Sequence, residues 1–563
     1  MTEHATSIGS RLPPGLPQSL DVPAVDVGAV LRGAAARYSD RVAYHHGGSE
    51  VSYRQLLADA AQVARGLRAR GVQPGDVVAV HLPNCLQYPA VYYGILLAGA
   101  VFSPTNPLLP AADLAFQLTD SAAVAVVTWG QAAAVFAAVR DQLPARLVVT
   151  VDAQLADAVT LVDLGAGQPT EAPVERPAPS QLAHLAYSGG TTGRSKGVPL
   201  THRHVVTNTL QSACWTSGSI AVLDGGGDLL LEQVGPDDEW PTRLGTGVAV
   251  NLTPWFHAMG VIGYLNVPLL CGYTTVIHQR FEPGAYLADV ERFGATMIGG
   301  APPVFVALLG HPDIATRDLS TVLGLSSGAA PLPVATLQAL AQRFPDAVVM
   351  EGYGLTEVTM VATMNPSWRS GVRKVGTVGL PAHDTEVRLV DAEGRPVPAG
   401  ERGEVCLRGP QVMAGYHRQP EATAEMLTDG WLRTGDIGEL DADGYLSIVD
   451  RAKDMLLYKG YNVFPRELEE LLHTHPAVAG AAVVGRPDAE AGELPVAFVA
   501  LLPGSAVTAD ELTQYVNAQV VPYKKLREVH LVDAIPVSAA GKVLRRELRD
   551  RVNSGPLDTA VTT

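Results

Sequence analysis

Alternation of helical and strand patterns over most of the chain limits the fold more than any other feature. Up to about Val449, helical segments such as 53–71 alternate with short runs rich in Val, Ile and Ala, such as 76–82 and 122–129. Such alternation is typical of βαβ units and parallel sheets. Because 563 residues are too many for one hydrophobic core, we expect two or more domains.

The pattern changes twice towards the carboxy terminus. Residues 386–409 form two alternating runs joined by Gly and Pro turns, which predicts antiparallel hairpins and a small barrel-like subdomain. After Asp450 a new helix-and-strand block begins, and it ends near Leu548. We therefore expect a large domain over 1–450, a small domain over 451–550 and a disordered tail over 551–563.

Charge and cysteine content exclude several classes of protein. A net charge of -16 argues against a nucleic-acid partner, since such proteins need a basic surface. The amino terminus lacks a basic region followed by an apolar run, and the longest apolar stretch, 91–102, is shorter than the roughly 20 residues that cross a bilayer. We expect a soluble, cytoplasmic protein without a membrane span. Scattered cysteines without a C-x-x-C pair fit a reducing compartment: Cys85, Cys214, Cys271 and Cys406.

A loop at 187–197, YSGGTTGRSKG, has the composition of a phosphate-binding loop. Glycines let backbone N–H groups approach an anion, small hydroxyls add donors, and Lys196 adds positive charge. The segment is not a Walker A loop, because Ser195 precedes Lys196 and Gly197 follows it. Alone, such a loop is as often structural as functional.

Two other short motifs carry possible chemistry. In EGYGLTE at 351–357, Tyr353 could stack on a base and Glu357 could hold Mg²⁺, although a tight turn is the simpler explanation. The sequence GLSSG at 324–328 matches the nucleophile elbow of α/β-hydrolases. No histidine after Ser326 has a supporting context, so hydrolase chemistry is disfavoured.

Taken together and in this order, seven motifs resemble those of the acyl-adenylate-forming superfamily, which includes acyl-CoA synthetases, adenylation domains of peptide synthetases and beetle luciferases. The sequences of these motifs are most similar to those of fatty-acid–CoA ligases. Gly189 and Ser195 depart from the Ser and Pro that the family often has. The motifs are YSGGTTGRSKG (187–197), SSGAAPL (326–332), EGYGLTE (351–357), GWLRTGD (430–436), DRAKD (450–454), YKGYNVFPRELE (458–469) and PVSAAGKVLRREL (536–548).

The resemblance implies an α/β fold. Its large N-terminal domain would contain two βαβ-type subdomains and a small β-barrel, and a hinge at Lys453 would join it to a smaller, mobile α+β C-terminal domain. The implied reaction is ATP-dependent activation of a carboxylic acid to its acyl-AMP with release of pyrophosphate, then transfer of the acyl group to a thiol. The implied cofactors are ATP, Mg²⁺ and coenzyme A.

The resemblance also implies residue roles. The catalytic residues would be Lys542, Thr356, Glu357, His257 and Lys459, with Glu357 also holding the metal. The nucleotide would bind Ser188, Gly189, Gly190, Thr191, Thr192, Gly193, Lys196, Gly328, Ala329, Ala330, Glu351, Gly352, Tyr353, Thr356, Asp436 and Arg451. The acid pocket would be lined by His257, Met259, Val261, Gly299, Gly300, Ala301, Gly328, Gly352 and Gly354, and the thiol would meet Lys459 and Gly460.

Several alternatives stay open from the sequence. Small lining residues without a dedicated acidic partner favour a fatty or aryl acid over an amino acid, and the adenylated group could instead be an unusual non-carboxylate oxyanion. The acceptor is free coenzyme A or a separate acyl or peptidyl carrier protein. His257 could be a packing residue, and a non-catalytic paralogue is disfavoured by the retained motifs. We expect residues 218–247 to be a long mobile loop, either a surface insertion or a lid.

Overall fold

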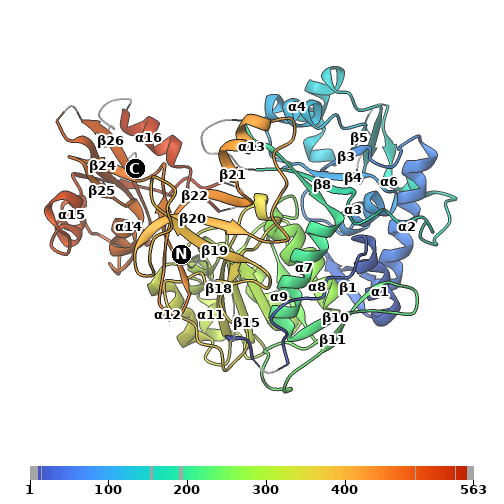
Figure 1. Ribbon diagram of the computed structural model, residues 1–563, viewed down its shortest axis with the longest axis horizontal. Helices are drawn as coiled ribbons and strands as arrows, with labels where there is room; N and C mark the ends of the chain where they lie inside the picture. Colours follow the sequence, from blue (N-terminus) through green and yellow to red (C-terminus); the bar gives the residue numbers. More distant parts are fainter. Residues whose placement is uncertain are drawn as a thin grey trace.

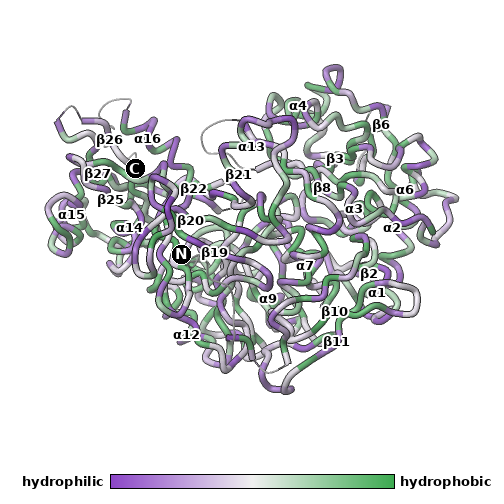
Figure 2. The backbone as a smooth tube through the Cα atoms, viewed as in Figure 1, coloured by the Kyte–Doolittle hydropathy of each residue, from purple (hydrophilic) through white to green (hydrophobic). Residues whose placement is uncertain are grey.

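A large amino-terminal domain and a smaller carboxy-terminal domain lie side by side (Figure 1). The computed structural model describes residues 11–13, 15–152, 155, 157–188, 194–488, 490–538 and 541–553. This mixed α/β architecture confirms the predicted fold class. Hydrophobic backbone segments gather inside both domains, and hydrophilic segments mark the outer loops (Figure 2).

A seven-stranded sheet of order β7-β6-β5-β3-β4-β8-β9 supports the amino-terminal half. Its neighbours are parallel except β8 and β9. The connecting helix α3 (Tyr88–Leu97) is apolar on all sides and fully buried, as expected of a helix enclosed between layers. The strands are β3 (Val77–His81), β4 (Val101–Pro104), β5 (Ala125–Thr128), β6 (Leu147–Thr150), β7 (Val159–Thr160), β8 (Leu182–Tyr187) and β9 (Gly197–Thr201), with α2 (Tyr53–Ala69) and α4 (Ala111–Asp120) on its faces.

A nine-stranded sheet of order β18-β17-β16-β15-β14-β12-β13-β1-β2 supports the second half. The run from β16 to β1 is parallel, so the carboxyl ends of β14, β15 and β16 meet at one edge. The strands are β1 (Val42–His46), β2 (Ser49–Ser52), β12 (Val248–Asn251), β13 (Thr274–Ile277), β14 (Met297–Gly300), β15 (Gly324–Ser327), β16 (Val348–Tyr353), β17 (Thr363–Met364) and β18 (Leu380–Pro381). Among the accompanying helices are α1 (Gly28–Tyr38), α7 (His202–Ser217), α8 (Val267–Leu270), α9 (Pro283–Arg292), α10 (Pro302–Leu309) and α12 (Val334–Arg343).

Five antiparallel strands form the small sheet predicted after residue 386. Both β21 and β23 pair with β22, while β20 pairs with its other edge. The strands are β19 (Glu386–Val390), β20 (Arg402–Arg408), β21 (Leu427–Thr428), β22 (Trp431–Leu440) and β23 (Leu446–Arg451). Among the strands that the structure describes, no pair joins β19 to β23, so this barrel-like sheet is open.

The small domain has its own sheet and core. The antiparallel order β25-β24-β27-β26 is completed by β28, which runs parallel to β27. Leu468 and Leu472, four residues apart on one face of α14, are buried in that core. Its elements are β24 (Leu456–Tyr458), β25 (Tyr461–Val463), α14 (Pro465–His473), β26 (Val478–Asp488), β27 (Gly492–Leu501), α15 (Ala509–Asn517), β28 (Glu528–Val532) and α16 (Arg545–Asn553). The boundary at 450/451 stays a prediction.

Two predictions about disorder need correction. The segment 218–247 is not a mobile loop, because it contains the paired strands β10 (Ser219–Leu223) and β11 (Leu229–Gln233). Burial of Leu229 and Leu231 against α1 holds the hairpin in place. The predicted tail begins too early, since α16 continues to Asn553; residues 554–563 lie outside the described part of the chain.

The remaining sequence expectations concern cysteines and membranes. All four cysteines are buried free thiols. Within the described ranges no helix has both the length and the apolar character to cross a bilayer.

Candidate functional site

A cavity of about 1340 Å³ lies between the two domains, where strands β14, β15 and β16 end. Crevices beyond the carboxyl ends of parallel strands are the usual ligand sites of α/β sheets. Sixteen of the predicted residues line this cavity: Ser188, Lys196, His257, Met259, Gly299, Gly328, Ala329, Glu351, Gly352, Tyr353, Gly354, Thr356, Glu357, Arg451, Lys453 and Lys542.

The phosphate-binding loop is described only at its two ends. Gly189, Gly190, Thr191, Thr192 and Gly193 lie outside the described residues. At the base of the loop, the Ser188 N–H donates to the Lys196 carbonyl oxygen (2.9 Å), which closes the β8–β9 connection. The Lys196 ammonium group lies 4.7 Å from the centre of the Tyr416 ring. The base of the loop therefore presents a cation to the cavity.

Asp436 is held by two donors beside the cavity. The Tyr353 hydroxyl donates to its Oδ2 (2.6 Å), and Arg451 Nε donates to its Oδ1 (3.1 Å). Asp436 itself does not line the cavity, whereas its described neighbours Thr434 and Gly435 do. Each carboxylate oxygen can accept a further hydrogen bond. The two donors therefore hold the Asp436 carboxylate in place and leave it able to bind a ligand hydroxyl.

Glu357 is the predicted metal ligand. It is 8% exposed, and its Oε1 accepts a hydrogen bond from the Tyr416 hydroxyl (2.8 Å). Burial, together with the Glu357 charge, raises the Tyr416 pKa, so this hydroxyl remains a donor. Within the described ranges no group of three or more His, Cys, Asp or Glu side chains could hold a metal. A single carboxylate still fits Mg²⁺ that is bound mainly through substrate phosphates and water.

Glycines bring backbone to the cavity wall. A Cβ on Gly354 would lie 1.8 Å from the Met360 carbonyl oxygen, so this position accepts no side chain without movement of the backbone. Lys196, Arg451 and Lys542 surround the same space. Close backbone and several cations make the lining suitable for a nucleoside triphosphate.

Lys542 enters the cavity from the small domain. It belongs to a turn in which the Ser538 N–H donates to the Lys542 carbonyl oxygen (2.7 Å). The turn touches the large domain, because a Cβ on Gly541 would lie 2.6 Å from the Ala301 Cβ. Burial and the nearby Arg451 charge lower the Lys542 pKa, although Asp436 and Glu357 oppose the shift.

His257 faces the cavity from the start of a π-helix over Met259–Asn266. Such helices are rare and often occur at functional sites. A Cβ on Gly260 would lie 1.9 Å from the Pro254 carbonyl oxygen, so glycine is required for the chain to turn here. Burial, with a smaller effect of Lys542, lowers the His257 pKa to about 4, so the imidazole is neutral near pH 7.

Glu351 lies at the cavity wall nearest the small domain. Its Oε1 accepts a hydrogen bond from the Leu332 N–H (3.0 Å). Burial raises the Glu351 pKa to about 7, despite this hydrogen bond and the Arg466 charge. Its protonation state therefore changes in the neutral range.

Nine residues of the cavity lining, seven of them apolar or aromatic, were missed by sequence reasoning. We call this set the inner limb, and it lies on α7, α8, the nine-stranded sheet and the segments next to its strands. No motif marks these residues, because they are ordinary positions far apart in sequence. The inner limb is lined by Ser212, Trp215, Thr216, Val267, Pro268, Tyr273, Met297, Met360 and Met364.

Besides Asp436, six predicted residues in the described part of the chain do not line the cavity. Val261 points into the core of the large domain, Gly300 faces Val304, and Ala301 meets the turn at Gly541. Ala330 lies just beyond the lining residue Ala329. Lys459 and Gly460 are exposed on the β24–β25 turn, where Lys459 has a φ of +49°.

Residues 218–247, all described, also contribute nothing to the cavity lining. Instead, Asp228 Oδ1 accepts a hydrogen bond from Arg32 Nε (2.7 Å), which ties the hairpin to α1. The hairpin is part of the scaffold in this structure. The observed contacts do not favour a lid.

Comparison with known proteins agrees with this geometry. The AMP-binding enzyme family matches residues 31–417, and its C-terminal domain matches residues 467–542. A long-chain-fatty-acid–CoA ligase of Bacillus subtilis (strain 168) is 32% identical, with 96% of this chain and 97% of that protein covered. A feruloyl-CoA synthase of an Amycolatopsis species is 36% identical, covering 90% of this chain and 95% of that one.

Solved structures give the same result. The anthranilate CoA ligase AuaEII in complex with anthranoyl-AMP superposes with a TM-score of 0.84 at 27% identity, covering 96% of this chain and 98% of that one. ATP-bound MatB from Rhodopseudomonas palustris has a TM-score of 0.81 at 28% identity, with coverage of 93% and 98%.

The chain is an AMP-forming acid–thiol ligase that uses ATP and Mg²⁺. It belongs to the AMP-binding enzyme family of adenylate-forming ligases.

Proposed function

We propose that the acid activated by this enzyme has an uncharged tail, either fatty or aryl, and that the acceptor is free coenzyme A. The observation that carries this proposal is the inner limb, whose nine residues include no ionisable acid or base except Tyr273. A charged tail would lose its hydration there without gaining a counter-ion. The similarity to a long-chain-fatty-acid–CoA ligase and a feruloyl-CoA synthase supports the same two acid classes.

In the first half-reaction, a carboxylate oxygen attacks the α-phosphorus of ATP and pyrophosphate leaves. Such transfers depend mainly on positioning and charge neutralisation. We assign Lys542 to the charge that develops at the α-phosphate, and Lys196 with the loop at 188–193 to the other phosphates. Thr356 lies beside Glu357 and would bind a phosphate oxygen, while Asp436, fixed by Tyr353 and Arg451, would accept the ribose hydroxyls.

Glu357 would hold Mg²⁺, which when bound neutralises phosphate charge. His257 lines the same cavity as the inner limb. Since its lowered pKa keeps it neutral, it can orient the carboxylate by hydrogen bonding without competing with Lys542 for charge. Gly299, Gly328 and Gly352 also line the cavity, where they would present backbone to the acid.

In the second half-reaction, the thiol attacks the acyl carbonyl and AMP leaves. We propose that the small domain turns at Lys453, which withdraws Lys542 and brings Lys459 and Gly460 to the cavity. The exposed β24–β25 turn supports this assignment, because it presents both residues to solvent in the present arrangement. The cytoplasmic location remains a prediction.

A pyrophosphate-release screen tests the proposal. Decanoate and cinnamate are compared with decanedioate, which has a charged tail, and each acid is tested with coenzyme A, with a phosphopantetheinyl carrier protein and with neither. We expect at least one monoacid class to be turned over to the thioester with coenzyme A, and decanedioate to be at least about 100-fold poorer because its second carboxylate is desolvated. Preference for decanedioate would contradict the inner-limb argument, and thioester formation only on the carrier would contradict the assigned acceptor.

A further inference from the structure

The turn that carries Lys542 joins a segment ending at Ser538 to a segment that continues into α16. The Lys542 N–H donates to Ser538 Oγ (3.2 Å), the Gly541 N–H donates to the Ser538 carbonyl oxygen (2.8 Å), and Val537 bridges to Val543. These contacts join the described ends of the turn. Its place in the cavity also depends on what holds the chain immediately after it, where α16 begins at Arg545.

Arg545 anchors the start of α16 inside the small domain. Its guanidinium donates to both carboxylate oxygens of Glu469 on α14, at 2.5 and 3.0 Å, and to the Val483 carbonyl oxygen on β26 (3.2 Å). The side chains of Arg545 and Glu469 are only 18% and 12% exposed. Bidentate pairs between arginine and carboxylate are among the more rigid contacts in proteins.

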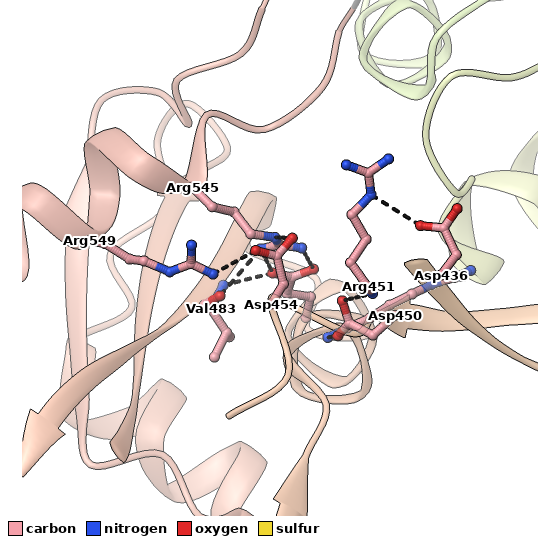
Figure 3. Close-up of polar contacts among 9 residues, drawn as sticks. Asp436, Asp450, Arg451, Asp454, Val483, Arg545 and Arg549 are labelled. Atoms are coloured by element: carbon pink, nitrogen blue, oxygen red, sulfur yellow. Dashed lines mark hydrogen bonds and ion pairs between the residues drawn. The ribbon is translucent and has the colours of Figure 1, made fainter. Parts of the chain in front are cut away.

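Asp454, the residue after the proposed hinge Lys453, joins the same network. Its Oδ1 accepts a hydrogen bond from Arg549 Nη2 (2.6 Å), and its Oδ2 lies 3.7 Å from Arg545 Nε. Figure 3 shows the guanidinium groups of Arg545 and Arg549 both directed at Asp454. The start of the small domain is thus tied to the helix that follows the Lys542 turn.

The network also reaches the large domain. The Asp454 N–H donates to the Arg451 carbonyl oxygen (3.0 Å), and the Arg451 side chain donates to Asp436, as Figure 3 shows. A continuous series of contacts therefore leads from the side of the cavity, through the hinge, to the base of the Lys542 turn.

We propose that Asp454, paired with Arg549 and Arg545, is a positioning residue that sets where Lys542 enters the cavity and thereby controls adenylation. This inference rests on the proposed role of Lys542. Asp454, Arg545 and Arg549 also line the cavity. In this scheme Asp454 acts through Lys542, because a hinge residue and the catalytic turn share one ion-pair network. Misplacement of a reacting group by 1 Å can cost about 100-fold in rate.

Arg549→Gln is the primary test, since Arg549, at 31%, is the most exposed of Asp454, Arg545 and Arg549. It removes the charge and keeps most of the side-chain stem. We expect the rate of acyl-AMP formation to fall about tenfold, which is less than the loss expected for a full 1 Å misplacement. The KM for ATP and the rate of thioester formation from supplied acyl-AMP should not change. Arg549→Lys, which can still pair with Asp454, should recover most of the rate.

Arg486→Gln is the matched control. Arg486 on β26 forms an ion pair with Glu528 on β28 (2.7 Å) in the same domain, so its replacement leaves the contacts of Asp454 in place. It should leave both half-reactions unchanged. Asp454→Asn serves as a second variant and should reduce adenylation at least as much as Arg549→Gln, because it weakens the contacts to both arginines.

A chemical readout separates positioning from general damage. Lys542 is largely buried in the cavity, so its amine should react slowly with an acylating reagent, measured by peptide mapping of the folded enzyme with Lys459 as the exposed reference. Arg549→Gln and Asp454→Asn should raise the Lys542 labelling rate several-fold relative to Lys459, and Arg486→Gln should not. Unchanged labelling with unchanged adenylation would overturn the proposal, as would equal loss of both half-reactions. If Lys542→Ala itself retains adenylation, the proposed function of Lys542 fails instead.

Discussion

Replacing Lys542 with alanine tests the central assignment of the adenylation site. Lys542 brings positive charge into a cavity that already contains Lys196 and Arg451, and burial lowers its pKa. At a separation of about 4 Å and an effective dielectric constant of about 20, one charge pair is worth about 4 kcal/mol. Loss of a preorganised donor in an active site typically costs about 3 kcal/mol, or more than 100-fold. We therefore expect acyl-AMP formation to slow by 100-fold or more.

The assay is single-turnover quench flow with the two half-reactions measured separately. Acyl-AMP formation is followed from acid and ATP, and thioester formation from supplied acyl-AMP and coenzyme A. Lys542→Ala should keep the second rate within about twofold, while Lys459→Ala should spare the first and slow the second. Equal losses of both half-reactions in both variants would refute the division of labour between the two lysines.

The pH dependence of the same step gives an independent check. The charged form of Lys542 is the active form, so the adenylation rate is full below its folded-state pKa and falls as pH rises through it. Because burial lowers this pKa from the ordinary value of 10.5, the alkaline decline should begin below that of an exposed lysine. Lys542→Arg should be slower but should lose this decline, since arginine stays charged. If the adenylation rates of both enzymes fall over the same alkaline pH range, a group other than Lys542 titrates.

Three further predictions concern stability and the cavity wall. Glu351→Gln should stabilise the protein at pH 8.5 by up to about 3 kcal/mol and have little effect at pH 4.5, which thermal melts at both pH values measure. The reason is that burial raises the Glu351 pKa to about 7, so ionisation of this carboxyl between the two pH values destabilises the folded protein. Gly354→Ala should reduce adenylation strongly in steady-state assays, because its Cβ would lie 1.8 Å from the Met360 carbonyl oxygen; wild-type kinetics would contradict that. Asp228→Asn should lower the free energy of unfolding by about 2 kcal/mol through its weakened pair with Arg32, while kcat stays unchanged; altered kcat without lost stability would revive the lid hypothesis.

The sequence alone determined the family, the fold class and most polar residues of the site. These features are local, since a glycine-rich loop, a Gly-Tyr-Gly strand end and a lysine turn each keep their chemistry within a few consecutive residues. Ser188, Lys196, Glu357 and Lys542 could be assigned from such motifs, and the cavity brings all four together.

Tertiary structure alone decided the remaining features. The inner limb is built mostly from apolar side chains that are far apart in sequence. An apolar side chain indicates that a residue is buried, not that it borders a cavity. Residues 218–247 were misjudged because glycine and acidic content resemble a loop, whereas burial of Leu231 and the pairing of Asp228 with Arg32 order the hairpin. The link from Asp454 to α16 spans 95 residues, and only packing of the small domain brings those charges within hydrogen-bonding distance.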